Sequence, residues 1–183
     1  SYTVSIDAQP TGQICTVSNA SGMVSTTNVS NVNVSCITNT YTISGTNSTS
    51  ASVSISGATP SNTSTTASSF SFTAKYGDTV TLAATKAGYT CSVNGTVTNP
   101  ITANSSGLTI SCTANTYTIG VTVSGLGSGK SVTLLLKDSL PSAISSDGSS
   151  VLWVAPYQYN YDVTVGVQPT GQTCTVSNGS GNV

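Results

Sequence analysis

Apolar and polar residues alternate with a period of two along much of the chain. The alternation is clearest in six segments, residues 41–44, 52–56, 70–74, 79–84, 89–93 and 108–112. A period of two indicates half-buried β-strands, because successive side chains of a strand point to opposite faces of the sheet. Clusters of Gly, Pro, Asn and Ser separate the segments, and none shows a convincing helical period. The pattern therefore predicts an all-β chain of short strands arranged as β-sandwich domains.

The two ends of the chain repeat each other. Residues 2–24 read YTVSIDAQPTGQICTVSNASGMV and residues 161–183 read YDVTVGVQPTGQTCTVSNGSGNV, an alignment without gaps. A weaker middle copy is marked by a cysteine pair that follows the first pair by 76 positions, from 15 to 91 and from 36 to 112. This period predicts three parts: residues 1–38 as the C-terminal part of one domain, 39–114 as a complete domain, and 115–183 as the N-terminal part of a third.

The equal spacing of the cysteines predicts one disulfide in each copy. We expect two pairs, Cys15 with Cys36 and Cys91 with Cys112, each separated by 21 positions. Strand parity places the second cysteine of each pair on the core face, and a bridge closing such a loop contributes about 3 kcal/mol. The absence of a C-x-x-C motif and of histidine argues against a redox or zinc role. Disulfides of this kind indicate an oxidising compartment, so the chain is expected to be extracellular or on the cell surface.

The fifth cysteine, Cys174, has no mate at the expected spacing. We predict a partner outside the chain, 21 positions further on, carried by a strand that the third copy lacks. An open sheet edge is costly to leave unpaired, so this slot is expected to be filled. The strand could come from a continuation of the polypeptide, the favoured interpretation, or from a neighbouring copy as in strand donation between pilins.

The composition leaves little catalytic chemistry. Charged residues make up 5% of the chain, the formal net charge is −1, and His, Arg and Glu are absent. Four lysines cannot build a nucleic-acid surface, and no apolar stretch is long enough for a membrane span. The carboxylates do not recur at equivalent positions in the copies, which argues against a shared acid–base or calcium site. They are Asp7, Asp78, Asp138, Asp147 and Asp162. We expect no catalytic residue, no metal and no cofactor.

An aromatic run near the C-terminus is the candidate contact surface. It consists of Trp153, Tyr157, Tyr159 and Tyr161, and we expect the tyrosines to lie on one strand. Such a strand could contact another copy, or it could stack against surface glycans. The alignment of Trp153 with Phe72 favours a core position for the tryptophan.

Several N-x-[ST] triplets occur along the chain, and three of them are candidate glycan acceptors. They begin at Asn47, Asn62 and Asn94. Such triplets arise readily by chance in a chain so rich in Asn, Ser and Thr. Glycosylation is therefore the less favoured interpretation.

One sequence phrase carries a resemblance to a known family. The phrase QPTGQTCTVSNGSG, followed in the first copy by N-V-x-V-x-C at residues 31–36, resembles the tandem Ig-like repeats of large secreted and surface proteins of Gram-negative bacteria. The likeness covers residues 2–36 and 161–183, whereas the middle copy keeps the cysteines but reads KAGYTCSVNG. The resemblance implies surface display, adhesion or appendage formation, with no catalytic residue.

These observations favour a structural role. We expect a repeat segment of an extracellular fibre, stalk or surface appendage that associates with other copies of itself or with adjacent repeats. Because the chain carries little charge, electrostatic repulsion between copies opposes self-association only weakly. The alternative is an adhesin or carbohydrate-binding array that uses the tyrosine strand.

Overall fold

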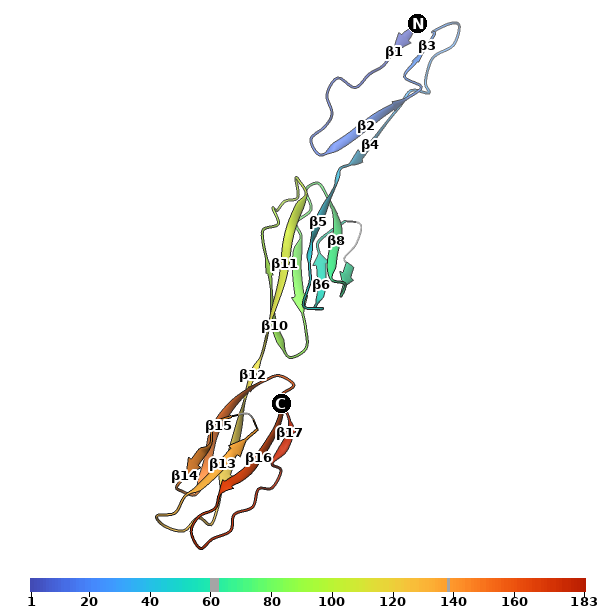
Figure 1. Cartoon of the computed structure of the whole chain (residues 1–183). Helices are drawn as coiled ribbons and strands as arrows, with labels where there is room; N and C mark the ends of the chain where they lie inside the picture. The colour runs from blue at the N-terminus through green and yellow to red at the C-terminus, as the bar shows by residue number, and fades with distance from the viewer. Residues whose placement is uncertain (60–62, 138) are drawn as a thin grey trace. The chain divides into compact units, whose positions relative to one another are not determined.

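The computed structural model describes residues 1–59, 63–137 and 139–183, so Asn62 and Asp138 lie outside the described residues. Regular structure in the described part is β throughout, which confirms the predicted all-β class. No described segment forms a helix that is long and apolar enough to cross a membrane. The chain divides into unit 1, Ser1–Lys86 with Cys91–Cys112, and unit 2, Ala87–Thr90 with Thr113–Val183 (Figure 1).

The strands of unit 1 are short, as the alternation predicts. They are β1 (Tyr2–Thr3), β2 (Gln13–Ser18), β3 (Ser21–Gly22), β4 (Asn33–Thr38), β5 (Thr40–Thr46), β6 (Ser52–Ser56), β7 (Thr63–Thr65), β8 (Ser69–Lys75), β9 (Thr81–Thr85), β10 (Tyr89–Asn94) and β11 (Ser105–Ala114). The first two residues of β10 belong to unit 2.

Two sheets of unit 1 enclose one hydrophobic core. The first has the order β10-β11-β5-β8, and the second has the order β7-β6-β9. Buried side chains of both sheets meet in this core, with Ile43 from β5, Val53 from β6 and Leu108 from β11 all at most 1% exposed. Within the first sheet β11 runs parallel to β5, whereas β8 runs antiparallel to it.

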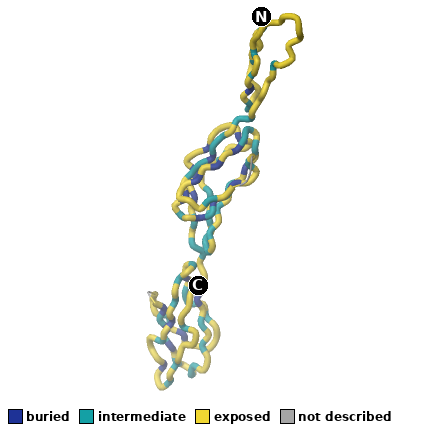
Figure 2. The backbone as a smooth tube through the Cα atoms, turned by 90° about the vertical axis from the view of Figure 1, so that its right-hand side faces the viewer, coloured by how far each residue is buried: buried dark blue, intermediate teal, exposed yellow. Residues whose placement is uncertain are grey.

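Residues 1–38 form two small antiparallel pairs with little burial. Strand β1 pairs with β3, and β2 pairs with β4 in a register that sets Cys15 opposite Cys36. Figure 2 shows the tube through these residues as largely exposed. Cys15 is buried, but Cys36 is exposed and Val34 is 54% exposed. The expected core position of Cys36 is wrong here, because no described sheet covers that face of β4.

Unit 2 has one core between a two-stranded and a four-stranded sheet. Its strands are β12 (Thr116–Val123), β13 (Val132–Leu136), β14 (Ser142–Ile144), β15 (Gly148–Pro156), β16 (Asn160–Val167) and β17 (Ser180–Asn182). Strand β12 pairs with β15, and the other sheet has the order β14-β13-β16-β17. Ile119, Leu134 and Val163 are among the residues at the centre of the core.

The first strand pairs of the two cores have the same register up to Ile119, after which the β12–β15 pair shifts by one residue. Ile43 of β5 lies opposite Phe72 of β8, and Ile119 of β12 lies opposite Trp153 of β15. Trp153 is partly buried against the core of unit 2, in agreement with its alignment to Phe72. Because the 76-residue spacing relates Ile43 to Ile119, the sequence repeat is also a repeat of strand register.

Candidate functional site

The described residues contain no cluster of three His, Cys, Asp or Glu side chains that could hold a metal ion. The features that recur from copy to copy are instead cysteines, glycines and their neighbours. They define two kinds of site: the surroundings of each first cysteine, and a cleft in unit 2.

Two disulfides bridge adjacent strands. Cys15–Cys36 joins β2 to β4 and Cys91–Cys112 joins β10 to β11, with Cα–Cα distances of 3.9 and 4.1 Å. Such short distances are typical of a non-hydrogen-bonded antiparallel pair, in which the backbone polar groups of the pair point away from the partner strand. Cys174 is free and partly buried.

In both terminal copies, a glutamine side chain forms hydrogen bonds with the outward-pointing backbone N–H and C=O of the first cysteine. Gln9 Nε2 donates to Cys15 O at 3.0 Å, and Cys15 N donates to Gln9 Oε1 at 2.6 Å. The same two bonds join Gln168 to Cys174, at 3.0 and 2.7 Å. Cys174 is therefore held in the local arrangement of Cys15, although only Cys15 has a disulfide partner.

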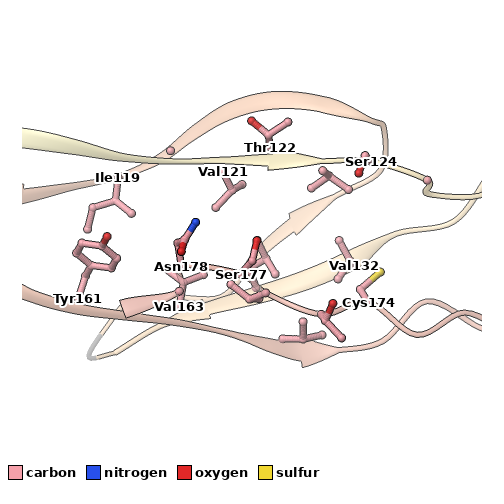
Figure 3. A pocket seen from close by; sticks show the side chains of 18 of the residues that line it. Ile119, Val121, Thr122, Ser124, Val132, Tyr161, Val163, Cys174, Ser177 and Asn178 are labelled. Carbon is pink, nitrogen blue, oxygen red and sulfur yellow. The ribbon is translucent and has the colours of Figure 1, made fainter. Parts of the chain in front are cut away.

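A cleft of about 790 Å³ opens beside Cys174 in unit 2. Its floor is apolar, and Figure 3 shows Ile119 and Val121 pointing from β12 across the cleft toward Tyr161 and Val163. The segment of residues 172–179 forms its opposite rim. The side chain of Gln172 fixes this rim, because it accepts from Gly127 N at 2.9 Å and donates to Gly125 O at 3.0 Å.

The cleft lies where unit 1 has a strand. In unit 1, β11 fills the space between β5 and β10. In unit 2, β12 is the counterpart of β5, and no described strand pairs with its second edge. The segment around Cys174 is the counterpart of β2 and β10, yet residues 173–177 form no strand.

The tyrosine run does not form one strand, contrary to expectation. Strand β15 ends at Pro156 and β16 begins at Asn160, with Gln158 at a φ of 65° in the turn between them. Each tyrosine contacts the protein itself. Tyr157 lies on Gly88, Tyr159 Oη donates to Lys137 O at 2.7 Å, and Tyr161 lies on Gly181. The tyrosines do not share a strand because the chain reverses direction in this turn, between β15 and β16.

Two equivalent connections join a tyrosine ring to a glycine. In unit 1 the ring of Tyr76 covers Gly12, Asn39 N donates to Gly12 O at 2.8 Å, and Tyr76 N donates to Asn39 O at 2.9 Å. In unit 2 Tyr157 covers Gly88, and Asn115 makes the corresponding bonds at 2.9 and 2.8 Å. Each glycine stands three positions before a first cysteine, and each asparagine three positions after a second one. We call this arrangement the Tyr–Gly connection.

One difference between the two connections lies at the residue that directly precedes the first cysteine. Thr90 Oγ1 donates to Asn115 Oδ1 at 2.8 Å in unit 2. In unit 1 Ile14 stands at the equivalent position, and Asn39 Oδ1 is buried without a hydrogen-bond partner among the described residues. A hydroxyl at residue 14 is therefore what the first connection lacks.

The carboxylate of Asp78 is surrounded by hydrogen-bond donors of the protein itself. Partial burial tends to raise its pKa, but three hydrogen bonds and the nearby Lys75 charge outweigh that effect and lower the pKa. The bonds come from Thr59 N at 2.7 Å, Lys75 N at 2.9 Å and Thr59 Oγ1 at 3.0 Å. Its ionised form thus holds residues 59 and 75 together rather than facing a cleft.

The triplet asparagines have different surroundings. Asn47 is 1% exposed, and its side chain bonds to Thr49, Ala51 and Ala67. A glycan cannot be attached to that side chain in the folded protein. Asn94 is exposed and donates to Ser111 Oγ at 3.0 Å, whereas Asn62 lies outside the described residues.

No protein-family model, curated protein or solved structure matches the chain.

Sequence reasoning missed the Tyr–Gly connection, whereas an open slot in the third copy was expected. The signal for the connection was present, since a glycine precedes each first cysteine by three positions. The distance between Gly88 and Tyr157 in sequence gave no reason to place them together. The residues that form the floor of this slot could not be named from the repeat, because they come from strands whose counterparts are covered in unit 1.

Proposed function

We propose that this chain is a segment of a structural array of tandem Ig-like β-sandwich domains, each with one internal disulfide, in an extracellular or cell-surface fibre, stalk or appendage. The single observation that carries the proposal is the twofold occurrence of the Tyr–Gly connection. A connection with the same hydrogen bonds in successive copies is suited to an array in which each repeat contacts its neighbours. The two disulfides are compatible with an oxidising compartment.

Self-association is supported by uncovered apolar side chains and low charge. Met23, Val34 and Ile37 are 76%, 54% and 68% exposed, all within residues 1–38. Exposed apolar side chains that gather in one region mark interaction sites. With a formal net charge of −1, copies of the chain repel one another weakly.

Sedimentation velocity and negative-stain electron microscopy of the whole chain test the proposal. We expect concentration-dependent oligomers that the double variant Val34→Ser/Ile37→Ser weakens by about tenfold in dissociation constant, because two apolar contacts are lost. The matched control is Val151→Ser/Val154→Ser, which alters two equally exposed valines of β15 and should leave association unchanged. A chain that stays monomeric at every concentration, or binds glycans as a monomer, contradicts the structural role.

A further inference from the structure

We infer that the cleft in unit 2 is a binding site for one additional β-strand, an extended V-x-V-x-C segment of another repeat with the sequence type of residues 32–36. This inference rests on the proposed function, because it names the partner through which repeats would join. It concerns a different surface from the exposed side chains of β4.

Both rims of the cleft have unpaired backbone. Strand β12 pairs with β15 along one edge, whereas its counterpart β5 pairs with β8 on one edge and β11 on the other. On the opposite rim, Thr173 and Thr175 make no backbone hydrogen bond to any other described residue. Two unpaired edges that face each other across an apolar floor favour insertion of a strand, since an extended segment can pair with both.

The first copy supplies the register for the Cys174 rim. In β2 and β4, Cys15 lies opposite Cys36, and Val17 opposite Val34. Residues 13–18 correspond to residues 172–177 in the gap-free alignment, and Gln168 holds Cys174 as Gln9 holds Cys15. The incoming cysteine should therefore lie opposite Cys174, and the second valine opposite Val176. Because Gln168 already binds the backbone N–H and C=O of Cys174, the hydrogen bonds to the incoming strand must come from Thr173 and Thr175.

The middle copy shows which side chains would enter the cleft. On β11, Leu108 and Ile110 are 1% and 4% exposed and fill the core of unit 1. The 76-residue spacing relates them to Val32 and Val34. Two valines of the incoming strand would therefore cover the floor, in the positions that two aliphatic side chains of β11 take in unit 1. A slip of one residue would turn them to the outer face.

The β12 rim differs from its counterpart in one respect. A Cβ on Gly45 of β5 would collide with the carbonyl oxygen of Leu108, so β11 approaches β5 closely at that point. Val121 occupies the corresponding position of β12 and points into the cleft. The incoming strand therefore takes its register from the Cys174 rim and pairs with β12 away from Val121.

A peptide with the sequence of residues 29–38, VSNVNVSCIT, is the probe. The chain's own copy of this segment is paired with β2 and bridged through Cys36, which is why a separate peptide is used. Its cysteine is supplied as a mixed disulfide with glutathione. The Cys174 thiolate attacks the peptide sulfur, a disulfide forms between Cys174 and the peptide, and glutathione leaves as its thiolate, so no further oxidant is required.

The rate of capture at Cys174 is followed by intact mass and peptide mapping. The matched control peptide, VSNNVSVCIT, exchanges each valine with its neighbour and keeps the same composition. We expect the native sequence to react at least about tenfold faster, because only its valines face the floor when the cysteine lies opposite Cys174. Equal rates would mean that Cys174 reacts with any exposed disulfide, and the inference would be overturned.

A second measurement removes the thiol chemistry. Cys174→Ser protein is mixed with the native-sequence peptide in which the cysteine is replaced by serine, and hydrogen exchange is measured. The amides of Thr173 and Thr175 should gain protection with this peptide and not with the valine-exchanged one. Exchange that is unaltered by either peptide also overturns the inference. If neither peptide experiment shows sequence-specific binding but the chain still forms concentration-dependent oligomers, the cleft is rejected and the structural array stands. If the peptide binds as expected but the chain stays monomeric, the cleft stands and the structural array is rejected.

Discussion

The ring of Tyr157 occupies the space where a Cβ of residue 88 would stand, and Gly88 has a φ of +73°. Only glycine meets both conditions without strain, because it has no Cβ and adopts positive φ freely. The same holds for Tyr76 and Gly12, whose φ is +74°. A short backbone contact of this kind ties the turn before a first cysteine to the strand end that follows β8 or β15.

Gly88→Ala should destabilise unit 2 by about 2 kcal/mol more than Gly129→Ala, because overpacking adds to the cost of the left-handed backbone. Gly129 is a matched control, since its φ is also +73° and no atom lies within 4 Å of its added Cβ. The measurement is chemical denaturation followed by Trp153 fluorescence, which reports on unit 2 because the chain has one tryptophan. Equal losses in the two variants would show that the ring contact contributes nothing.

The disulfides should be detectable by thiol counting. Native protein is expected to expose one reactive thiol, Cys174, and reduction should release four more. The double variant Cys91→Ala/Cys112→Ala should lower the stability of unit 1 by about 3 kcal/mol, through the freedom that its unfolded chain regains. Hydrogen exchange of the Ile43 and Leu108 amides measures this loss, with Cys174→Ala as the control. Five reactive thiols in native protein would contradict both bridges.

The strands could be predicted from sequence where burial alternates cleanly. The expected strand at residues 52–56 coincides with β6, whose Val53 and Ile55 are buried between exposed or partly exposed neighbours. The repeat also carried the register from Ile43 to Ile119. The alternation could not predict features that depend on residues far apart in the sequence. The burial of Asn47 depends on backbone groups of Ala51 and Ala67 that only the folded chain brings together. The exposure of Cys36 depends on the absence of a covering sheet among the described residues.

Ile14→Thr should stabilise the first Tyr–Gly connection. The new hydroxyl would donate to the buried Asn39 Oδ1, as Thr90 does to Asn115, and the third copy also has a threonine, Thr173, at this position. Satisfying a buried acceptor is worth about 1 kcal/mol, and Ile14 is 53% exposed, so little apolar contact is lost.

The isosteric control for this change is Ile14→Val, which has the shape of threonine without its hydroxyl. Hydrogen exchange of the Asn39 amide, which bonds to Gly12 O, reports on the connection. Slower exchange is expected in the threonine variant only. Faster exchange in both variants would show that the isoleucine side chain matters more than the missing donor.

Asp78 should make the stability of unit 1 fall in acid. Its pKa is lowered below the ordinary 3.8 in the folded protein, so the unfolded chain binds a proton at higher pH than the folded chain does. The contribution of Asp78 is therefore fully present above the unfolded pKa and is lost as the pH falls through the folded pKa. Carboxyl-carbon NMR titration should give Asp78 a midpoint below the ordinary 3.8.

Asp78→Asn isolates this effect from the other carboxylates. The single amide oxygen can keep the bonds that Thr59 N and Lys75 N donate to Oδ2, so at neutral pH the variant should lose about 1 kcal/mol because the acceptor is no longer charged and the bond from Thr59 Oγ1 to Oδ1 is lost. The difference between variant and native protein should shrink as the pH is lowered, because protonated Asp78 also loses its charged acceptor. A difference that stays constant down to the folded pKa would mean that the ionised carboxylate of Asp78 is not what holds residues 59 and 75 together.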